Sequence, residues 1–210
     1  MSDRVIAIDG PGGSGKSTVA EAVARRLGLE RLDTGAMYRA VTLLVLRSGA
    51  DPGDAGAATG LARSMELAVG ERVLLDGEDV TEAIRTAEVD RAVSAVSAHP
   101  AVRRELVRRQ RAWVAEHGGG VVEGRDIGSV VFPEADLKIF LTAEPSERAR
   151  RRAGQAGATD VVSTGAALAA RDHHDSSRPA SPLVVAEDAI VVDSTDKPIE
   201  EVVEEVISKL

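Results

Sequence analysis

Residues 10–17 carry the clearest chemical pattern in this chain. They read Gly10, Pro11, Gly12, Gly13, Ser14, Gly15, Lys16 and Ser17, and they fit G-x-x-x-x-G-K-[ST]. Glycines allow consecutive backbone N–H groups to surround phosphate oxygens, Lys16 can reach the β- and γ-phosphates, and the Ser17 hydroxyl can bind Mg²⁺. The segment through Thr18 is therefore predicted to bind a nucleoside triphosphate with its metal ion.

The same glycines also fit a second nucleotide-binding pattern. Gly10, Gly12 and Gly15 satisfy G-x-G-x-x-G, and Asp33 lies near the distance at which a dinucleotide fold places its ribose-binding acid. A dinucleotide site has no use for an ammonium and a hydroxyl directly after the last glycine, whereas a triphosphate with a metal ion needs both. The triphosphate interpretation is favoured over this one, and over a glycine turn that binds nothing.

The segments on either side of the loop predict a strand and a helix. Residues 5–8 form a short apolar run, which is typical of a buried parallel strand. From Lys16 onward, apolar residues recur at helical spacing until Gly28, which can end a helix. A helix N-terminus directly after the loop adds partial positive charge where phosphates would bind.

The rest of the chain predicts an α/β fold. We expect helices at about 36–48, 88–98, 100–117 and 198–210, strands at 121–122, 137–141 and 189–193, and an arginine-rich helix after the second of these strands. Short apolar runs at 67–69 and 73–75 predict a small antiparallel insert. Residues 153–182 are rich in Gly, Ala, Ser and Asp, so we expect a mobile surface segment, a candidate lid, with one short helix near 165–172.

The composition favours a small-molecule partner. With 210 residues, 43% of them hydrophobic, the chain is long enough to bury a substantial core. Its net charge of -8 and its few aromatic residues disfavour a nucleic-acid polymer. It contains no cysteine, no signal-peptide core and no apolar run near the roughly 20 residues that a membrane helix needs. We therefore expect a cytoplasmic protein with no membrane partner.

Two other classes of phosphate-loop protein fit the sequence less well. A GTPase reads guanine with Asn-Lys-x-Asp, and this chain contains no asparagine. An ATP-driven motor or helicase is normally larger and has a separate hydrophobic run that ends in paired acids, which is not found. An enzyme that phosphorylates a small molecule is the class that fits best.

Several strings after the loop closely resemble those of the bacterial cytidylate kinases. They are residues 32–39 (LDTGAMYR), 77–86 (GEDVTEAIRT), Arg103 with the run at 108–111, residues 123–133 (EGRDIGSVVFP), 182–183 and 193–195. The match runs nearly end to end. It implies a three-layer α/β phosphate-loop kinase with a parallel sheet, a small antiparallel insert that binds the nucleoside monophosphate, and a lid. The implied reaction is transfer of the γ-phosphoryl group of ATP to CMP or dCMP.

The resemblance also implies how the chain is divided and what it binds. The single kinase domain would have its core at about 1–60, 84–150 and 183–210, the insert at about 61–83 and the lid at about 151–182. ATP would be the phosphoryl donor, Mg²⁺ the metal ion, CMP and dCMP the small-molecule substrates, and the protein a monomer. A kinase for shikimate or another nucleotide and a nucleotide-gated binding protein stay open as alternatives.

Roles for individual residues follow from the same resemblance. It gives the acceptor phosphate to Thr34, Arg39, Arg125 and Arg178, the cytosine edge to Ser94, Arg103 and Asp126, the pentose to Arg171 and Asp175, and closure over ATP to Arg151. The catalytic residues would be Lys16, Arg125 and Arg178. Cations are needed because two nucleotides bring about six negative charges together.

Cytosine recognition by these residues is chemically consistent. Asp126 can accept a hydrogen bond from the amino group that distinguishes cytosine from uracil, and Arg103 can donate to the N3 and O2 side of the ring. Uracil would present a carbonyl oxygen to the carboxylate, at a cost on the order of a few kcal/mol.

Other charged residues are expected to bind no ligand. Arg148, Arg150 and Arg152 are expected on a solvated helix face, Arg108, Arg109 and Arg111 in solvated or structural pairs, and His173 and His174 on the surface. Asp9 and Glu123 lie at strand ends near the loop, and the sequence leaves their roles open. Glu123 stands where the family often has Asp, and the lid around 153–165 is short and poor in charge compared with the family pattern.

Overall fold

Two compact units make up the chain. The computed structural model describes residues 4–157 and 159–210; Met1 to Asp3, and Ala158 of the expected lid, lie outside the described residues. Unit 1 comprises Met1–Arg31 and His117–Leu210, and unit 2 comprises Leu32–Glu116. The division into core, insert and lid stays a prediction. None of the helices among the described residues is long and apolar enough to cross a membrane.

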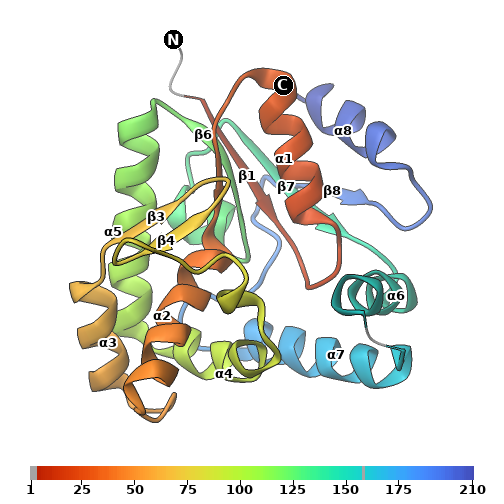
Figure 1. The fold of residues 1–210 in the computed structure, drawn as a ribbon. Helices are drawn as coiled ribbons and strands as arrows, with labels where there is room; N and C mark the ends of the chain where they lie inside the picture. The colour runs from red at the N-terminus through yellow and green to blue at the C-terminus, as the bar shows by residue number, and fades with distance from the viewer. Residues whose placement is uncertain (1–3, 158) are drawn as a thin grey trace. The chain divides into compact units, whose positions relative to one another are not determined.

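A five-stranded sheet organises unit 1 (Figure 1). Its strands, in spatial order, are β2 (Arg31–Asp33), β6 (Gly120–Gly124), β1 (Val5–Asp9), β7 (Leu137–Thr142) and β8 (Ile190–Asp193). The pairs β1–β6, β1–β7 and β7–β8 are parallel, which confirms the predicted fold class. The chain passes into unit 2 within β2, a strand that the apolar pattern did not predict.

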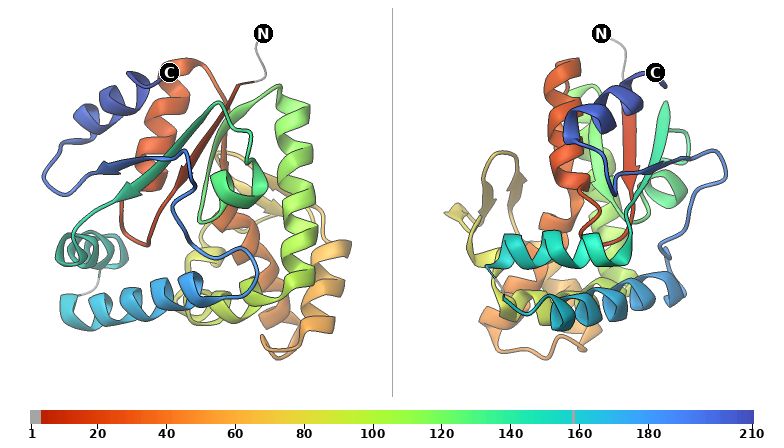
Figure 2. Two further views of the ribbon diagram at one scale, coloured as in Figure 1. Left: turned by 180° about the vertical axis from the view of Figure 1, so that it is seen from behind. Right: turned by 90° about the vertical axis from the view of Figure 1, so that its right-hand side faces the viewer.

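Helices α1 (Lys16–Leu27) and α8 (Ile199–Ile207) cover one face of this sheet, as both views in Figure 2 show. Val23 of α1 and Val206 of α8 are fully buried in one cluster with Ile8 of β1. The expected last helix at 198–210 is corrected at its end, because α8 stops at Ile207. Ile199 and Leu210 are 45% and 44% exposed, so only the apolar residues between them are buried.

Helices α6 (Pro145–Ala156) and α7 (Val161–Ser177) lie side by side in unit 1 (Figure 2). The expectation of one short helix near 165–172 is wrong, since α7 has 17 residues. Asp160 caps its start by accepting from the Ser163 N–H. A Cβ at Gly165 would lie 3.2 Å from the Ala149 Cβ, so the glycine permits close packing of α7 on α6. Tertiary contact therefore stabilises a helix whose Gly and Ser content suggested a loop.

Unit 2 consists of helices and a small sheet. Its elements are α2 (Thr34–Ser48), α3 (Ala55–Ser64), β3 (Leu67–Val69), β4 (Val73–Leu75), β5 (Glu78–Asp79), the 3-10 turn η1 (Ala83–Arg85), α4 (Ala87–Ala98) and α5 (Pro100–His117), whose last residue belongs to unit 1. The sheet is antiparallel in the order β3-β4-β5, as predicted for the insert. The sequence did not predict α3, which Asp54 caps through the N–H groups of Gly56 and Ala57.

Candidate active site

The phosphate loop of unit 1 connects the end of β1 to the start of α1 and has little room for side chains. Gly10 has φ +149° and its Cβ would lie 2.0 Å from the Leu141 carbonyl oxygen. Gly13 has φ +75° and its Cβ would lie 2.6 Å from the Arg148 carbonyl oxygen. These glycines are required because the loop passes directly against the backbone of β7 and α6.

Gly13→Ala is expected to destabilise the loop and weaken ATP binding by roughly tenfold or more, because both the left-handed conformation and the Arg148 carbonyl oppose a Cβ. The matched control is Gly28→Ala. Gly28 ends α1 with φ +66° and nothing lies within 4 Å of its would-be Cβ. That variant should lose only about 1 kcal/mol of stability and keep its ATP affinity. Thermal unfolding measures the change in stability, and calorimetric titration measures the change in ATP affinity. Equal ATP affinities in the two variants would contradict the claim that the Arg148 carbonyl leaves no room for a Cβ at Gly13.

Lys16 lies at the start of α1, and its ammonium donates to the Pro11 carbonyl oxygen at 2.7 Å. Burial lowers the pKa of Lys16 to about 7, and the nearby charge of Arg125 is the second cause of this shift. The carboxylates of Glu123 and Asp172 oppose this shift. Near neutral pH the side chain is therefore protonated in only part of the molecules, and a phosphate group placed beside it would favour the charged form.

ATP binding is expected to take up close to one proton at pH 8 and far less at pH 6. The lysine pKa lies near 7 without nucleotide, so Lys16 is mostly neutral at pH 8 and becomes charged beside the phosphates. Calorimetry in two buffers with different ionisation enthalpies measures the uptake. Lys16→Met should remove it, and equal uptake in the variant and the wild type would show that another group takes up the proton.

Ser17 and Glu123 form a pair of possible oxygen ligands for a metal ion at the end of the loop. The Ser17 hydroxyl donates to Glu123 Oε2 at 2.8 Å, and Arg31 donates to Glu123 Oε1 at 2.8 Å. Glu123 ends β6 and is only 3% exposed. A hydroxyl and a carboxylate are ligands that suit Mg²⁺, so the residues present fit the predicted metal.

Asp9 supports the backbone that follows β6. Its carboxylate accepts the N–H groups of Ile127 and Gly128, at 2.8 and 2.7 Å, at the start of the π-helical turn η2 (Ile127–Val131). Burial raises the pKa of Asp9 to about 6, although the two N–H donors oppose the shift. The position whose role the sequence left open therefore anchors the turn after Arg125 and Asp126.

Four predicted acceptor residues come together in unit 1. Arg125 donates to the Gly10 carbonyl oxygen at 2.7 Å, and its Nε lies 3.1 Å from Asp175. Arg178 lies 3.4 Å from Asp175 and 3.8 Å from Asp126, and it donates to the Ser181 carbonyl oxygen. All of these side chains except that of Ser181 are largely buried, so the structure holds the two arginines in fixed positions between carboxylates.

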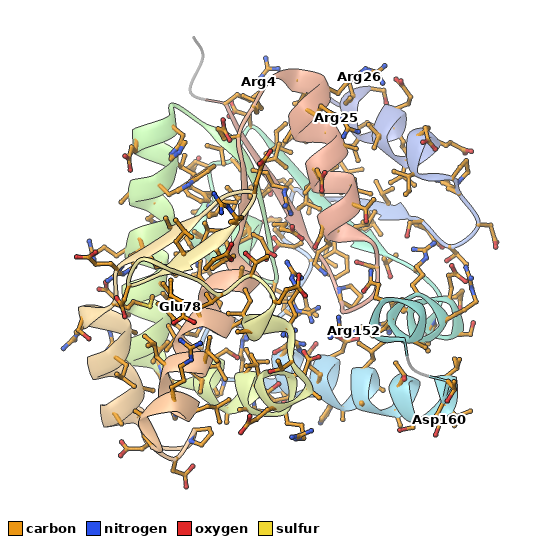
Figure 3. The ribbon with its side chains drawn as sticks, viewed as in Figure 1. Arg4, Arg25, Arg26, Glu78, Arg152 and Asp160 are labelled. Carbon is orange, nitrogen blue, oxygen red and sulfur yellow. The ribbon has the colours of Figure 1, made fainter. Side chains whose placement is uncertain are left out.

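The arginines of α6 differ in their surroundings. Arg148 donates to the Gly12 carbonyl oxygen at 3.0 Å and pairs with Asp172, so the expectation of a solvated position for Arg148 is wrong. Arg151 donates to the carbonyl oxygens of Ser194 and Thr195, at 2.7 and 3.2 Å. Arg150 is exposed and pairs with Glu147 on its own helix, as expected. Arg152 extends from the same helix (Figure 3).

Unit 2 holds four more of the predicted acceptor residues. Arg39 of α2 donates to the Ile84 carbonyl oxygen at 3.1 Å and pairs with Asp90 of α4. Arg103 of α5 is buried, with its guanidinium 5.1 Å from the centre of the Tyr38 ring. Thr34 begins α2 and is buried, while Ser94 is half-buried on α4. Their roles in acceptor binding stay predictions.

The two adjacent histidines of α7 lie on the surface of the helix. His173 and His174 are exposed, as expected, and the described part of the chain contains no group of three or more His, Cys, Asp or Glu residues placed to hold a metal ion. Arg108 and Arg109 pair with Glu105 on α5, which confirms them as structural pairs.

Asp172 is the main residue of this site that the sequence did not single out. Its Oδ1 accepts the Gly12 N–H at 3.0 Å, from a position 160 residues further along the chain. Arg171, its neighbour on α7, is half-buried. No sequence spacing predicts the contact of Asp172 with the loop, because it depends on how α7 packs.

Comparison with known proteins agrees with these features. The family model for cytidylate kinase matches residues 6–210. A cytidylate kinase from Mycobacterium leprae (strain Br4923) is 54% identical over 200 residues, covering 93% of this chain and 90% of that protein. One from Rhodococcus opacus (strain B4) is 51% identical over 211 residues, covering 96% and 92%.

A solved structure supports the fold alone. A gluconokinase from Sinorhizobium meliloti 1021 is similar with a TM-score of 0.54 and 15% identity, covering 98% of this chain and 90% of that one. The family match and the relatives at about half identity decide the classification. This chain belongs to the cytidylate kinase family.

Proposed function

We propose that this protein transfers the γ-phosphoryl group of ATP to CMP or dCMP, giving ADP and CDP or dCDP. The contact that best supports the proposal lies within unit 1, between a residue assigned to the acceptor and the loop assigned to the donor. Arg125, assigned to the acceptor phosphate, donates to the carbonyl oxygen of Gly10, the first residue of the donor loop. The family match over residues 6–210 supports the identity of the acceptor.

The donor side rests on the loop and on α6. The backbone N–H groups and Lys16 would bind the phosphates of ATP, and Arg151 would close over the nucleotide. Ser17, with Glu123 beside it, would hold Mg²⁺, which supplies positive charge to the phosphates when bound. Electrostatic stabilisation by fixed cations is the main catalytic contribution expected of these side chains.

The acceptor side needs cations and no protein nucleophile. The attacking atom is a phosphate oxygen of CMP that is already ionised near neutral pH. We assign that phosphate to Thr34, Arg39, Arg125 and Arg178, the cytosine edge to Ser94, Arg103 and Asp126, and the pentose to Arg171 and Asp175. Arg39 pairs with Asp90, and Arg125 pairs with Asp175. Both arginines are therefore oriented before the acceptor binds. We also propose a monomer.

An assay that couples ADP release to a colour change tests the proposal across CMP, dCMP, UMP, AMP and shikimate. Rapid ADP release with CMP and dCMP, and much slower release with the others, is the expected result. Release that depends on shikimate or AMP instead would assign the chain to a different small-molecule kinase. ATP binding with no acceptor-dependent release would indicate a nucleotide-gated binding protein.

A further inference from the structure

Asp172 places a carboxylate in direct contact with the phosphate loop. Its Oδ1 accepts the Gly12 N–H at 3.0 Å and lies 3.5 Å from Arg125 Nη1. Its Oδ2 pairs with Arg148 Nη1, and that guanidinium also donates to the Gly12 carbonyl oxygen. One carboxylate thus accepts from a loop amide and lies between two arginines, which is the kind of environment that binds a phosphate oxygen.

The position of this carboxylate along the loop is defined by Lys16. The Gly12 N–H belongs to the same peptide group as the Pro11 carbonyl oxygen, to which the Lys16 ammonium donates at 2.7 Å. In a loop of this kind the lysine reaches the β- and γ-phosphates. The two contacts are made at one trans peptide group, on its opposite sides, so the Asp172 carboxylate lies one peptide group away from the lysine that would reach the terminal phosphate. The charge of Asp172 also acts on the pKa of Lys16, which it raises.

Close packing of α7 holds Asp172 there. Leu168, one turn earlier on α7, lies so near the loop that a Cβ on Gly12 would be 2.8 Å from its Cδ2. Asp172 and Leu168 share a face because they are four residues apart. The Asp172 side chain is only 14% exposed. The contact is thus part of a packed surface between α7 and the loop.

We propose that Asp172 is a positioning residue that stands in for the terminal phosphate of ATP. In the absence of nucleotide its carboxylate holds Arg125 and Arg148 around the position of that phosphate. When ATP binds, the γ-phosphate displaces the carboxylate and pairs with Arg148, and Arg125 is released to bind the acceptor phosphate. ADP has no γ-phosphate and leaves Asp172 in place. The inference rests on the proposed role of ATP as the donor, and it makes Asp172 a determinant of the relative affinities for ATP and ADP.

The test compares the binding of ATP and ADP to Asp172→Asn by calorimetry. Removing the competing charge should tighten ATP binding by roughly tenfold, since a charge-assisted hydrogen bond no longer has to be exchanged, and should change ADP binding less than about twofold. The control is Asp160→Asn, at the start of the same helix (Figure 3), which removes one negative charge and leaves a residue that also caps helices well. It should change neither affinity.

Two results would overturn the inference. Unchanged or weaker ATP binding in Asp172→Asn would show that the carboxylate does not compete, and equal tightening of ATP and ADP would place it away from the terminal phosphate. Crystals of the wild-type protein with a non-hydrolysable ATP analogue and with ADP give an answer that needs no variant. The contact between Asp172 and the Gly12 N–H should be broken only in the first, and a contact retained with the ATP analogue would refute the inference. The coupled assay on the wild type tests the proposed function separately, because it measures only whether ADP release requires CMP and does not report whether Asp172 is displaced.

Discussion

Lys16→Met is expected to lower phosphoryl transfer by roughly 10²- to 10³-fold while leaving the protein folded. Lys16 is the cation of the loop, held by the Pro11 carbonyl oxygen where it can reach the transferring group. Methionine has a similar length and fills the same space without a charge. The measurement is the steady-state rate of ADP release with CMP at saturating ATP.

The thermal stability of this variant separates a catalytic role from a structural one. Burial lowers the pKa of Lys16 to about 7, below its unfolded value of 10.5, so the charged form destabilises the fold. The wild-type protein should therefore gain stability as the pH rises from about 7 towards 10.5. Lys16→Met should be as stable as the wild type or more so at pH 6, and it should lose this pH dependence.

Lys138→Met is the matched control for these measurements. Lys138 is also buried, but its ammonium reaches Asp188 at 2.7 Å, outside the phosphate loop. This variant should keep the catalytic rate. If Lys16→Met unfolds under the assay conditions, so that its loss of rate reflects loss of folded protein, the lysine mainly supports the fold.

Arg125→Ala is expected to lower transfer to every nucleoside monophosphate by roughly 10²-fold or more, because the guanidinium would stabilise the charge that develops on the phosphoryl group. The ratio of kcat/KM for CMP to that for UMP should stay near the wild-type ratio, because the phosphate is common to both acceptors. Arg125 also pairs with Asp175, so thermal unfolding of the variant must accompany the rate measurements.

Asp126→Ala, one residue further on, is expected to change the preference between acceptors more than the overall rate. Losing the acceptor for the cytosine amino group should lower the CMP-to-UMP ratio by roughly tenfold or more, with a smaller effect on UMP alone. Asp126→Asn keeps the size of the side chain and can donate to the uracil carbonyl, so it should shift the ratio further towards UMP. Equal losses on both acceptors in the Arg125 and Asp126 variants would refute this division of roles.

The sequence was sufficient to predict most strands of the parallel sheet and several of the helices. The strands β1, β6, β7 and β8 and the helices α1, α4 and α5 were all expected near their observed positions. Helices α3 and α7 were missed or shortened because they are rich in Gly, Ala and Ser, and clusters of Gly and Ser are typical of loops. Their start signals, Asp54 and Asp160, are single capping residues that also occur in turns.

The candidate site was predictable where it is local in sequence. The loop is one contiguous segment, so its type followed from residues 10–17 alone. The pairing of Arg148 with Asp172 had no such signal, because the two residues lie on separate helices and meet only when α6 packs on α7. The contact between Asp9 and η2 likewise depends on the alignment of β1 with β6.

A crystal structure with a non-hydrolysable ATP analogue and CMP bound together is the most informative single experiment. We predict that the Lys16 ammonium lies within about 3.2 Å of the β- or γ-phosphate oxygens, and that Arg39 and Arg125 both bind the phosphate of CMP. If Arg39 and Arg125 instead point away from CMP, with its phosphate held by other groups, the proposed transfer between these two nucleotides by these residues is wrong.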